Sequence, residues 1–125
     1  MKSAILKKNG CIAVEESNIP KLNRNQSLVK IKNVGVCSSD VPRAFNNGAY
    51  NYPLVMGHEI SAEIIEPSSK NSKLKKGDRV TIFPLLPCFK CSACKKKLYA
   101  QCKNYSYYGS RENGGYSEFL AVKDW

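Results

Sequence analysis

Residues 87–102 read PCFKCSACKKKLYAQC, and this stretch constrains the fold more than any other part of the chain. Its cysteines, Cys88, Cys91, Cys94 and Cys102, follow the spacing C-x2-C-x2-C-x7-C. Four thiolates from one short segment can complete a tetrahedral shell around Zn²⁺ and leave no open position, which is the arrangement of a structural zinc site. The spacing therefore predicts a zinc-binding loop at residues 88–102.

Two other uses of such cysteines are weaker interpretations. In an iron–sulfur run the fourth cysteine usually follows after three residues and precedes a proline, whereas here the gap is seven residues and Lys103 comes next. Structural disulfides are typical of secreted proteins, but residues 1–6 lead directly into Lys7 and Lys8, without the apolar stretch of a signal peptide. The sequence favours zinc in a cytoplasmic protein.

Length and composition indicate one globular domain. The chain has 125 residues with 42% apolar content, and no apolar run reaches the length that spans a membrane. The formal charge of +10 is of the kind found in nucleic-acid-binding proteins. However, much of it lies in the clusters Lys70–Lys76 and Lys95–Lys97, and a four-thiolate zinc site would offset about two charges. We therefore interpret these lysines as solvated and expect neither a nucleic acid nor a membrane as partner.

The apolar pattern predicts short strands connected by turns. Ala4–Leu6 and Cys11–Glu15 flank Asn9-Gly10, a strong hairpin signal. Further strands are predicted at Leu28–Val36, Ile60–Ile65, Arg79–Phe83 and Tyr116–Val122. One short helix is predicted at Ser39–Phe45, with Pro42 in its first turn. The fold class is mainly β, as a partly open barrel with few short helices.

A second group of metal-ligand residues lies upstream of the cysteine loop. Cys37 ends one predicted strand, and His58 and Glu59 open another. Alone, the histidine would more often be a packed residue, and the cysteine a small buried hydrophobe. Together, a thiolate, an imidazole and a carboxylate make a ligand set that leaves room for substrate, which is typical of a catalytic zinc.

Five motifs in this order resemble the zinc-containing medium-chain alcohol and polyol dehydrogenases: VGVCSSD (34–40), GHE (57–59), GDRV (77–80), the cysteine loop and GGYSEFL (114–120). The resemblance implies a GroES-like barrel over residues 1–125, as the N-terminal, incomplete part of a catalytic domain. Family members carry an NAD-binding Rossmann domain after this region. The eight glycines of this chain form no G-x-G-x-x-G motif. We therefore expect that the chain alone neither binds NAD nor transfers hydride.

The resemblance also implies roles for single residues. Cys37 and His58 become ligands of the catalytic zinc, and Glu59 becomes a ligand either directly or through one water. Ser39 becomes the hydroxyl that takes the proton from the substrate alcohol, and Asp40 the partner that fixes the tautomer of His58. Simple helix capping is the alternative for Ser39 and Asp40. The four cysteines of the loop become the structural zinc ligands.

Three stretches look most like the polyol dehydrogenases that oxidise a sugar-alcohol phosphate with NAD⁺: residues 39–61, 83–91 and 108–119. The residue six beyond the zinc cysteine faces the substrate in this branch. Here it is Arg43, whose planar guanidinium could make paired hydrogen bonds to a phosphate. A surface arginine near the end of a helix is the alternative. Arg111 is a weaker candidate for the same contact. Pro42 stands where alcohol dehydrogenases can carry a histidine that extends the proton relay.

The expected substrate is therefore a polyol or sugar-alcohol phosphate, and we expect a homo-oligomer. Two other classes remain open. One is a stand-alone, non-catalytic zinc-binding or interaction module with the same fold. The other is a basic zinc ribbon that binds nucleic acid, which would leave Cys37, His58 and Glu59 without a purpose.

Overall fold

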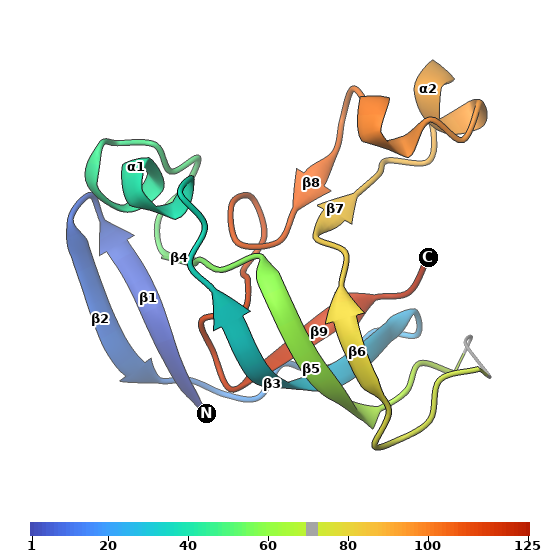
Figure 1. Ribbon diagram of the computed structural model, residues 1–125, viewed down its shortest axis with the longest axis horizontal. Helices are drawn as coiled ribbons and strands as arrows, with labels where there is room; N and C mark the ends of the chain where they lie inside the picture. The colour runs from blue at the N-terminus through green and yellow to red at the C-terminus, as the bar shows by residue number, and fades with distance from the viewer. Residues whose placement is uncertain (70–72) are drawn as a thin grey trace.

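The computed structural model describes residues 1–69 and 73–125, and within these ranges the strands form three antiparallel sheets (Figure 1). The first sheet has the order β2-β1-β4, from β1 (Lys2–Lys8), β2 (Cys11–Glu16) and β4 (Leu54–Val55). The second has the order β6-β5-β3-β9, from β3 (Gln26–Gly35), β5 (Glu59–Glu66), β6 (Arg79–Ile82) and β9 (Phe119–Lys123). The third pairs β7 (Leu85–Leu86) with β8 (Ser106–Tyr107).

The two larger sheets are joined through the segment that precedes β9. The Ala4 amide donates to the Tyr116 carbonyl at 2.8 Å, and the Glu118 amide donates to the Lys2 carbonyl at 3.1 Å. Over the described residues the sheets thus curve toward each other without closing into a complete barrel. The predicted mainly-β, partly open barrel with few short helices is confirmed.

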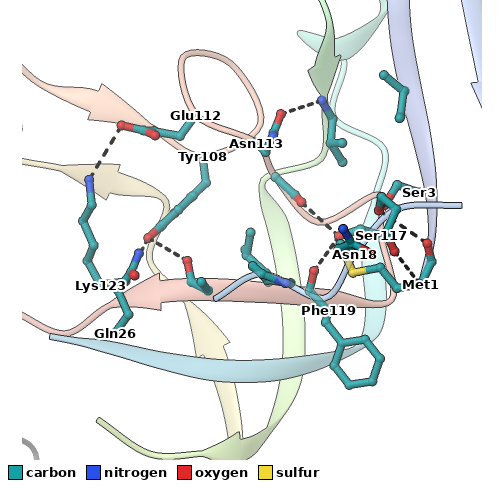
Figure 2. A pocket seen from close by; sticks show the side chains of 17 residues that line it. Met1, Ser3, Asn18, Gln26, Tyr108, Glu112, Asn113, Ser117, Phe119 and Lys123 are labelled. Atoms are coloured by element: carbon teal, nitrogen blue, oxygen red, sulfur yellow. Dashed lines mark hydrogen bonds and ion pairs between the residues drawn. The ribbon is translucent and has the colours of Figure 1, made fainter. Parts of the chain in front are cut away.

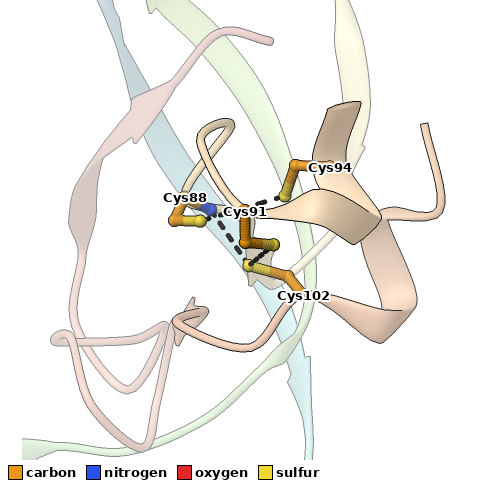
Figure 3. A group of neighbouring side chains, drawn as sticks. All are labelled: Cys88, Cys91, Cys94 and Cys102. Carbon is orange, nitrogen blue, oxygen red and sulfur yellow. Dashed lines mark hydrogen bonds between the residues drawn. The ribbon is translucent and has the colours of Figure 1, made fainter. Parts of the chain in front are cut away.

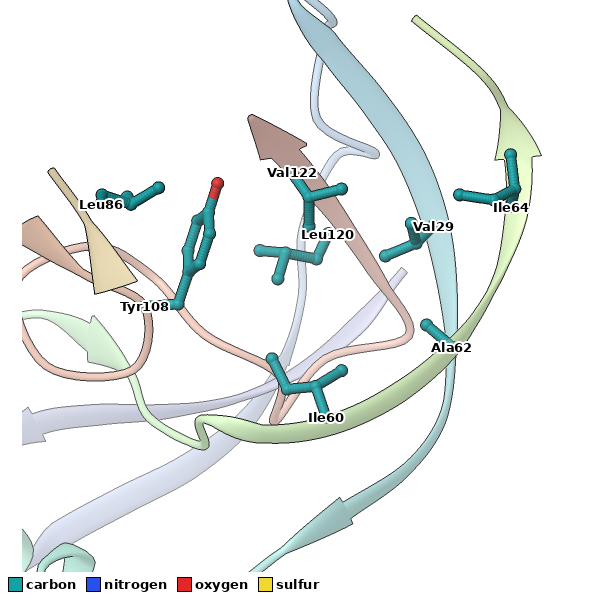
Figure 4. Packing of buried hydrophobic residues seen from close by; sticks show 8 residues of the cluster. All are labelled: Val29, Ile60, Ala62, Ile64, Leu86, Tyr108, Leu120 and Val122. Carbon is teal, nitrogen blue, oxygen red and sulfur yellow. The ribbon is translucent and has the colours of Figure 1, made fainter. Parts of the chain in front are cut away.

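The main core lies on the concave face of the second sheet (Figure 4). Along β5 the residues Ile60, Ala62 and Ile64 are 4%, 2% and 1% exposed, because alternate side chains of a strand point to one face. The other buried members of this cluster are Val29, Leu86, Tyr108, Leu120 and Val122. This packing fixes β5, and therefore the residues that open it, relative to β3.

A smaller core anchors the helix beside the candidate site. Leu6, Leu54 and Met56 pack around Ala44 of α1 (Asp40–Phe45). Leu6 and Leu54 are 0% and 1% exposed. The helix is therefore held against β1 and β4 by apolar burial.

The predicted elements are present with shifted ends. The helix starts at Asp40, with Ser39 at its N-cap, and the last strand starts at Phe119 and not at Tyr116. The Tyr116 amide instead donates to the Met56 carbonyl at 3.0 Å, so Tyr116 crosses toward the first sheet. Sequence reasoning missed β4, β7, β8, α2 (Ser92–Lys95) and the 3-10 helix η1 (Tyr99–Gln101), which are too short to show periodicity.

The lysines of the two basic clusters are exposed to solvent, as predicted, wherever the structure describes them. Lys73, Lys75, Lys76 and Lys95–Lys97 are exposed, while Lys70 lies outside the described residues. None of the helices in residues 1–69 and 73–125 has the length and apolar composition needed to cross a membrane.

Candidate metal sites and active-site cleft

The four loop cysteines converge on one point in the segment that connects β7 to β8 (Figure 3). Their sulfur atoms all lie within 4.8 Å of one another, and the Cys88–Cys94 and Cys91–Cys102 pairs are each 4.0 Å apart. A Zn–S bond of about 2.3 Å places tetrahedral sulfur atoms about 3.8 Å apart. These separations therefore fit a zinc ion and are too long for disulfide bonds.

Local backbone structure explains the convergence. Cys91 is the N-cap of α2 and Cys94 lies within it, so the two side chains share one turn of helix. Phe89 and Lys97 have positive φ angles of 57° and 60°, which reverse the chain on both sides of this turn. The Cys88 amide donates to the sulfur of Cys102 at 3.2 Å, a contact that stabilises a thiolate.

The thiols of the cluster differ in pKa. Burial raises the pKa of the Cys94 thiol to about 12. Hydrogen bonds from the amides of Cys94 and Lys103 lower the pKa of Cys91 to about 6. A divalent cation deprotonates the thiols that coordinate it. With such a cation bound, Cys94 would be a thiolate like Cys91, despite its raised pKa. The donor set thus suits the metal that the spacing predicts.

The second group is brought together by the pairing of β3 with β5. The register sets Gly35 opposite Glu59, which places Cys37 beside the start of β5. The ligand atoms of Cys37, His58 and Glu59 lie within 4.8 Å of one another. A Cβ at position 35 would collide with the Glu59 carboxylate, so glycine leaves the space that this side chain occupies.

Asp40 is the hub of hydrogen bonds beside this group. It is 3% exposed and accepts from Arg43 Nη1 at 3.0 Å, from the Cys37 amide at 3.1 Å and from the Tyr116 hydroxyl at 3.0 Å. Its Oδ1 also faces His58 Nδ1 at 3.6 Å, beyond hydrogen-bond distance. Nδ1 is buried and has no hydrogen-bond partner among the described residues. Asp40 therefore faces the nitrogen it is expected to orient, which leaves Nε2 for a metal.

The side chain of Ser39 points at the metal-ligand group. Its hydroxyl donates to the sulfur of Cys37 at 3.4 Å, and it makes no side-chain capping bond. Ser39 therefore occupies the N-cap position without a side-chain capping bond. Arg43 is not a surface arginine, because its side chain is only 14% exposed.

A cleft of about 400 Å³ opens beside these residues. It is lined by Ser39, Arg43, Tyr50, His58, Leu85, Ala100, Tyr105, Tyr107 and Ser110. The ring of Tyr107 meets the His58 ring edge-on at 5.7 Å, and burial raises the pKa of the Tyr107 hydroxyl. Sequence reasoning missed Tyr50, Tyr105 and Tyr107, because loop tyrosines give no periodic signal.

A second cavity, of about 370 Å³, lies in the open barrel between β1 and β9 (Figure 2). Polar side chains such as Asn18 and Gln26 line it. Within it the Ser117 hydroxyl donates to the Phe119 carbonyl at 2.9 Å. None of the metal-ligand residues lines this cavity, whereas His58 and Ser39 both line the cleft, which is therefore the candidate active site.

Two glycine motifs meet behind that site. Gly57 has φ of +88°, and its carbonyl accepts from the Gly115 amide at 2.8 Å. A Cβ on Gly114 would collide with the same carbonyl. The backbone of the GGYSEFL motif therefore supports the turn that presents His58, which explains why both motifs need glycine.

Tyr116 completes this support. Its hydroxyl lies 3.3 Å from the Gly35 carbonyl as well as 3.0 Å from Asp40. Burial, and to a smaller extent the nearby Asp40 carboxylate, raises the pKa of the Tyr116 hydroxyl to about 12. Tyr116 is therefore a neutral donor at physiological pH.

Residues 23–125 match the family model of the alcohol dehydrogenase GroES-like domain, and the chain belongs to this family. Galactitol 1-phosphate 5-dehydrogenase of Escherichia coli (strain K12) is 44% identical over 124 residues, which are 98% of this chain and 36% of that protein. L-galactonate-5-dehydrogenase of the same strain is 37% identical over 109 residues, which are 86% of this chain and 32% of that protein.

The structure agrees with these matches. The crystal structure of galactitol-1-phosphate dehydrogenase from Escherichia coli superposes with a TM-score of 0.94 at 44% identity and covers 98% of this chain. The matched part is 36% of that structure's chain. The chain thus spans about a third of the length of these relatives, and the GroES-like fold is confirmed.

Proposed function

We propose that this chain is the zinc-binding catalytic segment of an NAD-linked polyol dehydrogenase whose substrate is a sugar-alcohol phosphate of the galactitol 1-phosphate kind. The observation that carries the proposal is the group Cys37, His58 and Glu59, with ligand atoms within 4.8 Å, beside a cleft lined by Ser39 and Arg43. The 44% identity with galactitol 1-phosphate 5-dehydrogenase supports the substrate class. NAD would bind outside this chain.

In this proposal Cys37, His58 and Glu59 would hold a zinc ion, and such an ion would polarise a substrate hydroxyl and lower its pKa. Oxidation of the alcohol transfers a hydride from carbon to NAD⁺ and releases a proton from oxygen. Ser39 lines the cleft, and its hydroxyl is proposed to accept that proton. Pro42 has no proton acceptor in its side chain, so the proton passes from Ser39 to water or to the cofactor.

The other residues act on this group indirectly. Asp40 orients His58 and is itself held by Arg43 and Tyr116. The four loop cysteines would hold a second zinc ion, which would stabilise the loop without an open position for substrate. In this proposal the reaction depends on the first group.

Arg43 is proposed to bind the phosphate of the substrate. Its Nη1 is engaged by Asp40, but Nε is buried and has no hydrogen-bond partner among the described residues. Because the side chain also lines the cleft, the donors of its other terminal nitrogen, Nη2, can meet an anionic group. Arg43 thus has two candidate roles, and substrate comparison separates them.

The test uses a chimera in which this chain replaces the matching segment of the Escherichia coli enzyme. We expect NADH formation with galactitol 1-phosphate, and in Arg43→Ala we expect KM for this substrate to rise roughly 10- to 100-fold, as for the loss of charge-assisted hydrogen bonds. KM for unphosphorylated galactitol should change little. Arg79→Ala, an exposed arginine on β6, is the matched control.

Two results would contradict the assignment. Equal loss with both substrates would show that Arg43 acts only through Asp40. Equal activity on galactitol and galactitol 1-phosphate, unchanged by the substitution, would remove the phosphate from the proposed substrate.

Association between copies of the chain stays a prediction. Val36, Val41 and Phe45, beside the candidate site, are 75%, 53% and 54% exposed, and apolar patches of this kind favour association.

A further inference from the structure

The guanidinium of Arg111 is stacked between two tyrosine rings. Its central carbon lies 4.4 Å from the centroid of the Tyr50 ring and 4.1 Å from that of Tyr105. Its Nη1 also donates to the Tyr105 carbonyl at 3.3 Å. Both tyrosines line the cleft at His58, whereas Arg111 does not. The arginine therefore lies behind the wall of the cleft and not inside it.

One side of this stack is rigid. Arg111 belongs to a tight turn in which its own amide and that of Glu112 both donate to the Tyr107 carbonyl at 3.0 Å. The Glu112 carboxylate accepts from the Ser106 hydroxyl at 3.0 Å, and its carbonyl accepts from the Gly109 amide at 2.8 Å. The turn fixes the position from which the arginine extends.

The other side of the stack is weakly tied. Within the described ranges, residues 49–53 make no hydrogen bond with one another or with the rest of the chain. Ala49 packs against the smaller core formed by Leu6, Ala44, Leu54 and Met56. The next residue, Tyr50, is 64% exposed. The contact with Arg111 therefore ties this segment to the rigid turn.

We propose that Arg111 is a positioning residue that clamps Tyr50 to Tyr105 and thereby builds one wall of the active-site cleft. The clamp depends on a flat cation that can stack on two rings at once, which a guanidinium provides and an ammonium does not. The inference rests on the proposed function, because it assigns this wall to the carbon chain of an extended polyol. It contradicts the alternative that Arg111 contacts the phosphate.

The first test needs only the 125-residue chain. Chymotrypsin cuts after tyrosine and must take up the ring, so cleavage of the Tyr50–Asn51 bond requires the stack to open. We expect Arg111→Ala and Arg111→Lys to be cut there roughly 5- to 20-fold faster than wild type, with unchanged melting temperatures. The control Arg79→Ala should be cut at the wild-type rate. Cleavage of the Arg111 variants at the wild-type rate would overturn the clamp.

The second test is kinetic and uses the chimera described above. With Arg111→Ala and Arg111→Lys, KM should rise by the same factor, roughly 5- to 20-fold, for galactitol 1-phosphate and for galactitol, with a smaller change in kcat. Full rescue by lysine, or a rise confined to the phosphorylated substrate, would identify Arg111 as a phosphate contact and overturn the clamp. A wild-type chimera without activity would count against the proposed function, while cleavage at Tyr50 would still decide the role of Arg111.

Discussion

Replacing Cys94 with serine should empty the four-cysteine loop of zinc and destabilise it. Cys94 is 5% exposed and its sulfur lies 4.0 Å from that of Cys88, so a serine hydroxyl would sit among thiolates without being able to replace one. Structural zinc sites contribute folding free energy directly. Wild-type protein purified without added zinc should contain close to one firmly held equivalent, and the variant much less.

Metal analysis and thermal unfolding check this result together. We expect the melting temperature of Cys94→Ser to fall by on the order of 10 °C. Cys11→Ser is the control, because Cys11 is a partly buried free thiol that belongs to neither ligand group. If Cys94→Ser kept the zinc content and the melting temperature of the control, the loop would not be a metal site.

Replacing Cys37 with serine should abolish the chemistry and leave the loop intact. In the chimera we expect kcat/KM for galactitol 1-phosphate to fall by roughly 1,000-fold, because loss of metal assistance removes several kcal/mol of transition-state stabilisation. Zinc in the cysteine loop should remain, since the two ligand groups share no residue. The melting temperature should stay close to that of wild type.

Activity assays of Cys37→Ser and Cys11→Ser, each with its zinc content measured, decide the point. A Cys37→Ser chimera that keeps a tenth or more of the wild-type kcat/KM would contradict the assignment of Cys37 as a ligand. A simultaneous loss of both zinc ions would show that the two sites depend on each other.

The proximity of the residues in the two candidate metal-ligand groups was predictable from the sequence to different degrees. All ligands of the loop come from residues 88–102, so their spacing alone defines the site. Cys37 and His58 are separated in sequence and meet only because Gly35 pairs with Glu59 between β3 and β5. Their proximity therefore depends on strand register, which a single sequence does not specify, and the order of the family motifs had to supply it.

The walls of the cleft were not predictable. Tyr50, Tyr105 and Tyr107 come from loops, where neither hydrophobic periodicity nor spacing indicates which side chains will meet. The hydroxyl of Tyr116 reaches Asp40 only because its segment turns toward Met56 before β9 begins. The same turn explains why the predicted start of the last strand was wrong.

The most direct test of the two-site structure is the zinc content of the wild-type 125-residue chain before and after exposure to a chelator. One equivalent should resist removal, because its four ligands lie in one closed loop. Any second equivalent should be partial and easily removed, because Cys37, His58 and the exposed Glu59 leave their site open. A normally folded protein without metal and with disulfides in the loop would contradict this result, as would a second zinc held as firmly as the first.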